Sequence, residues 1–132
     1  MIEVDGSYLE GGGQILRTAC SLSAITKKPC RVFNIRKGRE KTGLMPQHLL
    51  GIQSLAKLNN AGLEGDFLGS EEIKFYPGDF VEVRLQQIPV KIETAGSIAL
   101  VLQILILPAL FAPNPIKITF EGGATDTFFS WN

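Results

Sequence analysis

A run of three glycines at residues 11–13 most constrains how this chain can fold. The run follows a short apolar segment at residues 1–4 and precedes a segment whose apolar residues recur with helical spacing. That order predicts a strand, a glycine turn and the N-terminus of a helix. Glycines let backbone amides approach a ligand closely, and the first helical turn carries unpaired N–H groups, so such a turn can bind an anion.

The residues around the glycines sharpen that prediction without proving it. Glu10 suits a divalent cation or a nucleotide hydroxyl at the same turn, and Arg17 is predicted near the same end of the helix. The turn matches neither GxGxxG nor GxxxxGK[ST], so neither of those phosphate-binding mechanisms is predicted. A plain strand-to-helix turn without a ligand stays open as an alternative.

The composition is that of a soluble globular chain with a core of its own. The 132 residues are 45% apolar and 20% charged, and the formal net charge of zero gives no global attraction to nucleic acid. Basic residues nevertheless concentrate at residues 27–41, where Glu40 is the single acid. Cys20 and Cys30 lack metal-type spacing and are predicted to be buried free thiols, which suits a reducing compartment. Because no signal peptide or membrane-spanning run is recognisable, a cytoplasmic protein without a membrane partner is expected.

Apolar spacing predicts a series of elements in the first part of the chain. They are a strand at 2–4, a helix at 14–25, a strand at 30–35, a loop at 36–46, a helix at 47–58 and strands at 63–68 and 73–76. The buried stripe of the first helix is predicted to comprise Ile15, Leu16, Ala19, Leu22 and Ile25.

The second part of the chain partly repeats the first. Strands are predicted at 80–85 and 90–93, a helix at 97–111 and a strand at 116–120, after which no further strand is expected. The predicted fold is α+β, an α/β sandwich of β-α-β-α-β-β units with helices on one face of a small sheet. The first unit covers residues 1–78, and residues 79–132 form an incomplete second unit. An incomplete unit would leave a sheet edge and an apolar helix face uncovered, which predicts a missing segment or a partner chain.

Several segments together resemble the N-terminal part of the RNA 3′-terminal phosphate cyclase family. They are residues 2–6, 9–17, 22–26, 34–39, 43–49, 68–70, 95–97 and 122–123, in the family's order. The resemblance implies an ATP-dependent enzyme that converts an RNA 3′-phosphate end to a 2′,3′-cyclic phosphate. It also implies histidine-adenylate and RNA-adenylate intermediates, and assistance by a divalent cation, magnesium or manganese. The implied fold has repeated β-α-β-α-β-β units and a smaller inserted domain.

The resemblance also implies roles for particular residues. Glu10 is expected near the nucleotide and its metal, and Gln103 near the adenosine. The phosphate and RNA-end site is expected to contain Arg17, Arg36, Arg39 and Gln47. No catalytic residue is expected in this chain, because the nucleophilic histidine of the family lies beyond Asn132, as do the inserted domain and the C-terminal part.

Two departures from the family pattern bear on activity. The prolines that wall the adenine in the family have no counterpart at residues 127–132. Together with the missing histidine, this predicts that the chain alone is inactive. It would then need a complementing C-terminal segment or self-association through the uncovered surface.

Alternatives remain for several of these residues and for the function. His48, the single histidine, opens an apolar helix and is predicted to have a structural or hydrogen-bonding role. Gln103 fits either ligand contact or an internal hydrogen bond. Aromatic residues on the strand patterns are predicted to be core, namely Phe33, Phe67, Phe75 and Phe80. A non-catalytic cyclase-like factor in RNA processing or ribosome assembly is the alternative function. An enolpyruvyl transferase built on the same repeat fits less well the arginine loop, the segment at 36–46 that carries Arg36 and Arg39.

Overall fold

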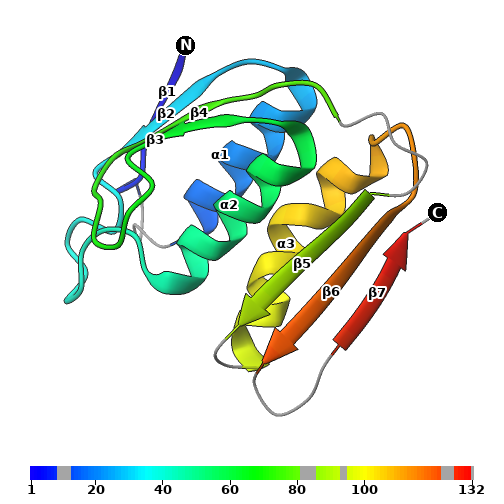
Figure 1. The fold of residues 1–132 in the computed structure, drawn as a ribbon. Coiled ribbons are helices and arrows are strands. Elements are labelled where there is room, and N and C mark those ends of the chain that lie inside the picture. The colour runs from blue at the N-terminus through cyan, green and yellow to red at the C-terminus, as the bar shows by residue number, and fades with distance from the viewer. Residues whose placement is uncertain (9–12, 81–85, 93–94, 123–126, 132) are drawn as a thin grey trace.

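The chain folds into two β-sheets with a layer of helices between them (Figure 1). The computed structural model describes residues 1–8, 13–80, 86–92, 95–122 and 127–131. Strands before residue 81 form one sheet, and strands after residue 85 form the other. The α+β fold class predicted from the sequence is confirmed.

The first sheet has four strands in the order β1-β2-β4-β3. Its unit comprises, in chain order, β1 (Ile2–Asp5), α1 (Gly13–Thr26), β2 (Cys30–Phe33), α2 (Pro46–Asn59), β3 (Gly62–Glu64) and β4 (Ile73–Tyr76). β1 and β2 are parallel, so the chain must cross over between them, and α1 makes that crossover. β4 is antiparallel to both β2 and β3. The predicted β-α-β-α-β-β order is confirmed.

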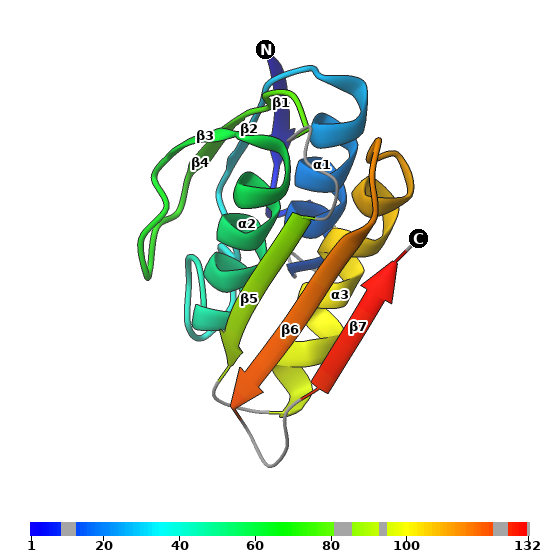
Figure 2. The same cartoon turned by 45° about the vertical axis from the view of Figure 1, so that its right-hand side comes forward.

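The second sheet has three strands in the order β5-β6-β7 (Figure 2). Its unit comprises β5 (Gln86–Ile92), α3 (Ala95–Leu110), β6 (Ile116–Gly122) and β7 (Thr127–Trp131). The prediction that no strand follows residue 120 is wrong, because β7 pairs antiparallel with β6 from Phe120↔Thr127 to Ile116↔Trp131. The parallel pairing of β5 with β6 leaves the other edge of β6 open, and a chain that turns back can add there as an antiparallel strand.

Two strands end earlier than the sequence predicts, at residues whose backbone φ angles are positive. β2 ends at Phe33 because Asn34 and Arg36 adopt positive φ angles of 53° and 56°, which break the strand. β3 ends at Glu64 because Gly65 turns with a φ of 82°. The strand predicted at 80–85 lies almost wholly outside the described residues. The strand predicted at 90–93 belongs to β5, which begins earlier, and Pro89 is tolerated there because β5 is an edge strand.

The core lies on both sides of the helix layer. On α1 the buried stripe contains Leu16, Cys20 and Ala24, four residues apart. The predicted stripe was right for Leu16 and wrong for Leu22, which is 47% exposed because it lies two residues from Cys20 and Ala24, away from their face. Cys20 and Cys30 are free and buried, as predicted.

The aromatic residues divide between core and surface. Phe75 is fully buried and Phe80 packs partly against the core, in agreement with the prediction. The core prediction for Phe67 is wrong: the ring lies in the β3–β4 loop and is 62% exposed. The helices of the described residues are all too short or too polar to cross a membrane.

Candidate functional site

The N-termini of α1 and α2 meet at Gly13, the first residue of α1. A Cβ atom at Gly13 would lie 2.3 Å from His48 Nε2 and 2.9 Å from Arg17 Nη1. Real Cβ atoms do not approach other atoms so closely, so only glycine lets these two side chains converge. Gly13 therefore lets an imidazole and a guanidinium come together at one point.

His48 is fixed by its own backbone segment. The Met45 N–H donates a hydrogen bond to His48 Nδ1 at 3.2 Å, at the start of α2. Because Nδ1 accepts, the ring proton resides on Nε2, the atom that faces Gly13 and Arg17. Burial, followed by the charges of Arg36 and Arg17, lowers the pKa of His48 to about 4. His48 is therefore a neutral hydrogen-bond donor at physiological pH, which extends its predicted hydrogen-bonding role.

Among the described residues, the Arg17 guanidinium is hydrogen-bonded through Nη2 but not through Nε. Its Nη2 donates to Gln14 Oε1 at 3.0 Å, and Gln14 Nε2 donates to Thr18 Oγ1 at 3.1 Å. The Nε atom of Arg17 is buried and has no hydrogen-bond partner among the described residues. Burial also lowers the pKa of Arg17 below its ordinary value. A buried donor without a partner is unfavourable by roughly 1–3 kcal/mol, and an anion would relieve it.

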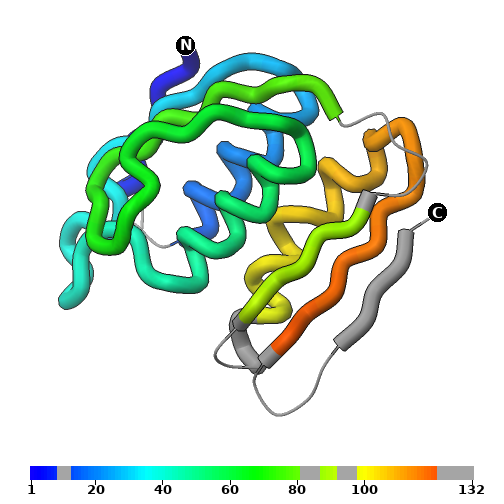
Figure 3. Tube along the Cα trace, viewed as in Figure 1, coloured from blue at the N-terminus to red at the C-terminus, as the bar shows by residue number. Residues whose placement is uncertain are grey.

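The arginine loop after β2 is attached to the β3–β4 loop, and the two run side by side (Figure 3). The Leu44 N–H donates to the Ser70 carbonyl, and the Gly69 N–H donates to the Leu44 carbonyl, each at 2.9 Å. Gly43 allows this contact, because a Cβ there would lie 2.1 Å from the Gly69 carbonyl oxygen. The loop is thus tied by backbone bonds that do not depend on its basic side chains.

The basic side chains of this loop differ in their surroundings. Arg36 is half-buried, its Nε donates to the Lys41 carbonyl at 3.3 Å, and its charge acts on His48. Arg39 is exposed, and its backbone N–H donates to the Arg36 carbonyl at 3.1 Å. The charges of Arg36 and Arg17 therefore both act on His48, whereas Arg39 is exposed on the loop.

A groove of about 110 Å³ between α1 and α3 contains two of the residues singled out from the sequence. It is lined by Gln14, Arg17, Thr18, Ser21, Leu22, Gln103 and Leu107. Ser21 Oγ donates to the Ile104 carbonyl at 2.8 Å, which fixes the two helices to each other beside the groove. Gln103 is exposed and belongs to this groove, so it shares a wall with Arg17.

The remaining predicted site residues have mixed outcomes. Gln47 is half-buried in the first turn of α2, next to His48. Glu10, expected at the nucleotide and its metal, lies outside the described residues. Among the residues that the structure describes, no three His, Cys, Asp or Glu side chains form a group able to hold a metal ion. Sequence reasoning missed the contribution of Gln14, although its place one residue after the glycine run was a usable signal.

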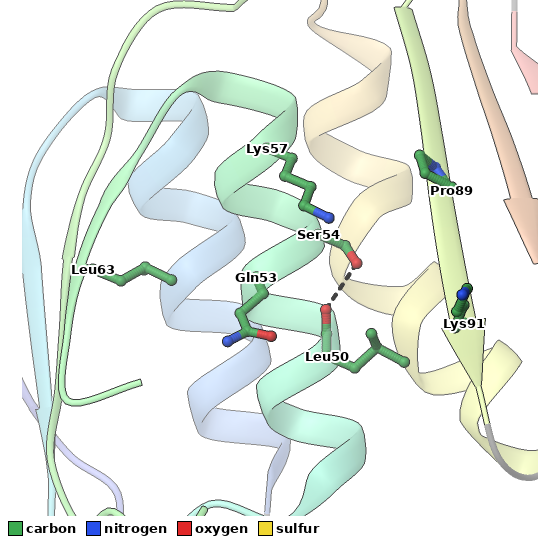
Figure 4. Close-up of a pocket in the computed structure, with 7 residues that line it drawn as sticks. All are labelled: Leu50, Gln53, Ser54, Lys57, Leu63, Pro89 and Lys91. Atoms are coloured by element: carbon green, nitrogen blue, oxygen red, sulfur yellow. Dashed lines mark hydrogen bonds between the residues drawn. The ribbon is translucent and has the colours of Figure 1, made fainter. Parts of the chain in front are cut away.

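A larger cleft of about 450 Å³ lies on another part of the molecule, between α2, β3 and β5 (Figure 4). Its lining comprises Leu50, Gln53, Ser54, Lys57, Leu63, Pro89 and Lys91. Ser54 Oγ is already bonded to the Leu50 carbonyl at 2.8 Å. None of the residues predicted for the site lines this cleft, so the candidate site is at the helix N-termini and the adjoining α1–α3 groove.

Comparisons with a family model and with individual known proteins point to one family. The family model described as RNA 3′-terminal phosphate cyclase matches residues 8–130. A protein of that name from Sulfurisphaera tokodaii is 52% identical over 123 residues, which cover 93% of this chain and 35% of the relative. Another from Pyrococcus furiosus is 50% identical over 132 residues, covering 100% of this chain and 37% of the relative. One from Nostoc punctiforme is 46% identical over 132 residues, covering 97% and 38%. The chain spans little more than a third of the length of these curated relatives.

Proposed function

Because this chain belongs to the RNA 3′-terminal phosphate cyclase family, we propose that its helix N-termini bind the 3′-phosphate end of an RNA. The observation that carries the proposal is the buried Arg17 Nε, which lacks a partner among the described residues, on a guanidinium whose Nη1 lies with His48 Nε2 beside Gly13. A terminal phosphate carries between one and two negative charges and several acceptor oxygens. It matches a site of this kind better than a neutral ligand does.

The described side chains would contribute different interactions to a bound phosphate. Arg17 and Arg36 supply charge, and the planar guanidinium groups can each donate two hydrogen bonds to phosphate oxygens. His48 supplies a neutral Nε2–H donor, because its pKa of about 4 keeps the ring unprotonated at Nδ1. A neutral third donor limits repulsion among the cations when the site holds no phosphate, and the N–H groups of the first turn of α1 add their dipole.

The complete reaction extends beyond these residues. We propose that the chain contributes to an ATP-dependent conversion of an RNA 3′-phosphate to a 2′,3′-cyclic phosphate, with magnesium or manganese assisting. Bound ATP would supply the activating nucleotidyl group, and Gln14, Arg17 and Gln103 have the polar groups to hold part of it. Ligand pockets usually measure roughly 300–1,000 Å³. The groove of about 110 Å³ is smaller, so it fits a phosphate or the edge of a base.

In this scheme the single histidine is a hydrogen-bond donor to the phosphate, and we do not assign it as the nucleophile. Its Nδ1 accepts the Met45 N–H, and its Nε2 is directed at Gly13 and Arg17 inside a residue that is 5% exposed. A nucleophilic nitrogen needs a free lone pair and room for the attacked phosphorus. We therefore propose that this chain by itself binds the RNA end without forming a covalent nucleotide adduct.

The test compares two RNAs that differ only at the 3′ end, one with a phosphate and one with a hydroxyl. Fluorescence anisotropy of labelled RNA is expected to show roughly tenfold to hundredfold tighter binding of the phosphate end. Arg17→Met and Arg36→Met should each remove most of that preference. Lys28→Met, which removes one exposed charge away from the site, should weaken both RNAs slightly and equally.

Two results would count against the proposal. Equal affinity for both RNA ends would refute an end-specific site and favour a non-catalytic RNA-binding factor. An unchanged preference in folded Arg17→Met, with folding checked by circular dichroism, would remove Arg17 from the site.

A further inference from the structure

The chain leaves the core just before the arginine loop and returns to it at a neighbouring point. Ile35, which directly precedes Arg36, and Leu44 are each 2% exposed. The Gly43 N–H donates to the Ile35 carbonyl at 2.9 Å, so the two ends of this excursion are bonded to each other. Arg36 is therefore one residue from a fixed point, whereas Arg39 lies in the middle of the excursion.

The β3–β4 loop, residues 65–72, holds both fixed points through its backbone (Figure 3). The Ile35 N–H donates to the Glu71 carbonyl at 2.9 Å, and Leu44 adds two further backbone bonds to this loop. Ser70 is 4% exposed, and its hydroxyl donates to the Glu72 carbonyl at 2.7 Å, which fixes the loop internally. We call the contact of residues 69–71 with residues 35 and 43–44 the loop clamp.

The backbone at Arg36 adopts a conformation that needs support from its surroundings. Arg36 has a φ of 56°, and Asn34, on the other side of Ile35, has a φ of 53°. Asparagine adopts positive φ angles fairly often, but arginine does so rarely, because its Cβ crowds the backbone. Such a conformation persists only where the surrounding structure enforces it, and it is found most often at functional sites. The bonds of the loop clamp supply that support on both sides of the excursion.

The loop clamp depends on a close approach of two backbones at Gly43. Gly43 has a φ of 84°, and a Cβ there would lie 2.1 Å from the Gly69 carbonyl oxygen and 2.4 Å from its carbonyl carbon. Because these are backbone atoms, a larger residue at position 43 must push the two loops apart. Gly38 has a φ of 93°, but no atom lies within 4 Å of the position of its Cβ. Position 43 therefore sets the distance between the loops, and position 38 does not.

We propose that the loop clamp positions Arg36 for the RNA 3′-phosphate, and that Gly43 and Ser70 are positioning residues of this site. A guanidinium held in place before the ligand arrives loses less conformational entropy when it binds. The charge of Arg36 already acts on His48, so the clamp holds this arginine at the site before any phosphate binds. The inference rests on the proposed binding of the 3′-phosphate, but it also predicts a change at His48 that needs no RNA.

The first measurement is the pKa of His48, the single histidine, followed by NMR without RNA. The charge of Arg36 lowers that pKa, so Arg36→Met should raise it and provides the scale. Gly43→Ala should produce roughly half of that rise or more, because the displaced loop carries Arg36 away. Gly38→Ala introduces the same kind of backbone strain without a collision, so it should leave the pKa unchanged.

The double variant shows whether the change passes through Arg36. If it does, Gly43→Ala should cause no further rise of the His48 pKa in the Arg36→Met background. The second measurement is binding of the two RNAs that differ at the 3′ end. Gly43→Ala should lose most of the tenfold to hundredfold preference for the phosphate end, as Arg36→Met does, and Gly38→Ala should keep it.

A second variant tests the clamp without adding volume. Ser70→Ala removes the hydrogen bond to the Glu72 carbonyl and should shift both readouts in the same direction as Gly43→Ala, by less. Its matched control is Ser54→Ala. Ser54 is also 4% exposed, and its hydroxyl donates to the Leu50 carbonyl at 2.8 Å, outside the two loops.

Three results would overturn the positioning role. One is a folded Gly43→Ala variant with an unchanged His48 pKa and an unchanged RNA preference, which leaves the proposed phosphate binding intact. Another is a pKa rise that persists in the Arg36→Met background, because the clamp would then act on the burial of His48. If Gly43→Ala does not fold, equal values for Ser70→Ala and Ser54→Ala are the third. A parent chain without end preference would instead refute the proposed function, and the His48 shift would still support or overturn the positioning of Arg36.

Discussion

The two ends of the α1–α3 pair depart from ordinary protein surfaces in opposite ways. At the N-terminus of α1, polar groups are buried: Arg17 Nε lacks a partner among the described residues, and His48 is 5% exposed. At the C-terminal end of α3 and directly after it, apolar groups are exposed, with Leu110 at 53% and Phe111 at 60%. Each arrangement is unfavourable for a chain that folds alone.

The two ends differ in the kind of molecule that would stabilise them. Buried donors beside two arginines are stabilised by an anion, whereas exposed apolar side chains are stabilised by another apolar surface. The groove lined by Arg17, Gln103, Leu22 and Leu107 joins the two ends. The polar and the apolar end of the helix pair therefore border the same groove.

The largest expected effect concerns pH and the polar end. His48 has a folded pKa of about 4 against an ordinary value of 6.5, so the unfolded chain takes up the proton first as pH falls. The stabilisation is fully present above pH 6.5 and is lost as pH falls through about 4, by on the order of 3 kcal/mol. Urea unfolding across this range measures the loss. His48→Gln, whose amide oxygen can still accept the Met45 N–H, should flatten the dependence.

Three described carboxylates titrate mainly near or below the lower end of that pH range. Hydrogen bonds from Ser7, Arg31 and Lys27 hold the pKa values of Asp5, Glu72 and Asp79, respectively, below their usual range. The stability that these carboxylates contribute is lost as pH falls from their ordinary pKa values of 3.8 to 4.5 through their lowered folded values, so they overlap only the acidic end of the range assigned to His48. Equal slopes for the parent and His48→Gln would show that the histidine is not buried in its neutral form.

A smaller effect is expected when the convergence of the two helices is disturbed. Gly13→Ala places a methyl group 2.3 Å from His48 Nε2, so one of the facing side chains must move. Overpacking of this kind lowers the free energy of unfolding by about 1–3 kcal/mol. Urea unfolding should show that loss, while the matched Gly62→Ala, with its nearest contact at 3.8 Å, changes stability little. Equal stabilities for the two variants would mean that the imidazole and Arg17 do not converge on Gly13.

The smallest effect is expected at the apolar end. In the isolated chain, Phe111→Ser removes a ring that is 60% exposed, so the free energy of unfolding should change by less than about 0.5 kcal/mol. Thermal unfolding should place it beside Phe67→Ser, whose ring is 62% exposed. A loss near that of a core substitution would show that Phe111 already packs within this chain, and the contrast between the two ends would weaken.

The sequence by itself determined the order of elements and the place of the polar end. Apolar spacing and glycine or proline breaks are local signals, so they located α1, α2 and α3 and the order in which strands flank them. The glycine run indicated a tight helix start, and the resemblance pointed to Arg17, Arg36 and Gln103. The local sequence pattern could not place β7, because the addition of a strand depends on which edge of β6 is left open.

Only the tertiary structure decided which of these residues meet. Whether Leu22 or Cys20 faces the sheet depends on the rotation of α1 about its axis, which packing fixes and local spacing leaves uncertain. The neutral state of His48 required burial and two arginines from other segments. Gln103 shares a groove with Arg17 because Ser21 and Ile104 join α1 to α3. Contacts between residues far apart in the chain set burial, charge and pKa, and a local sequence pattern carries no information about them.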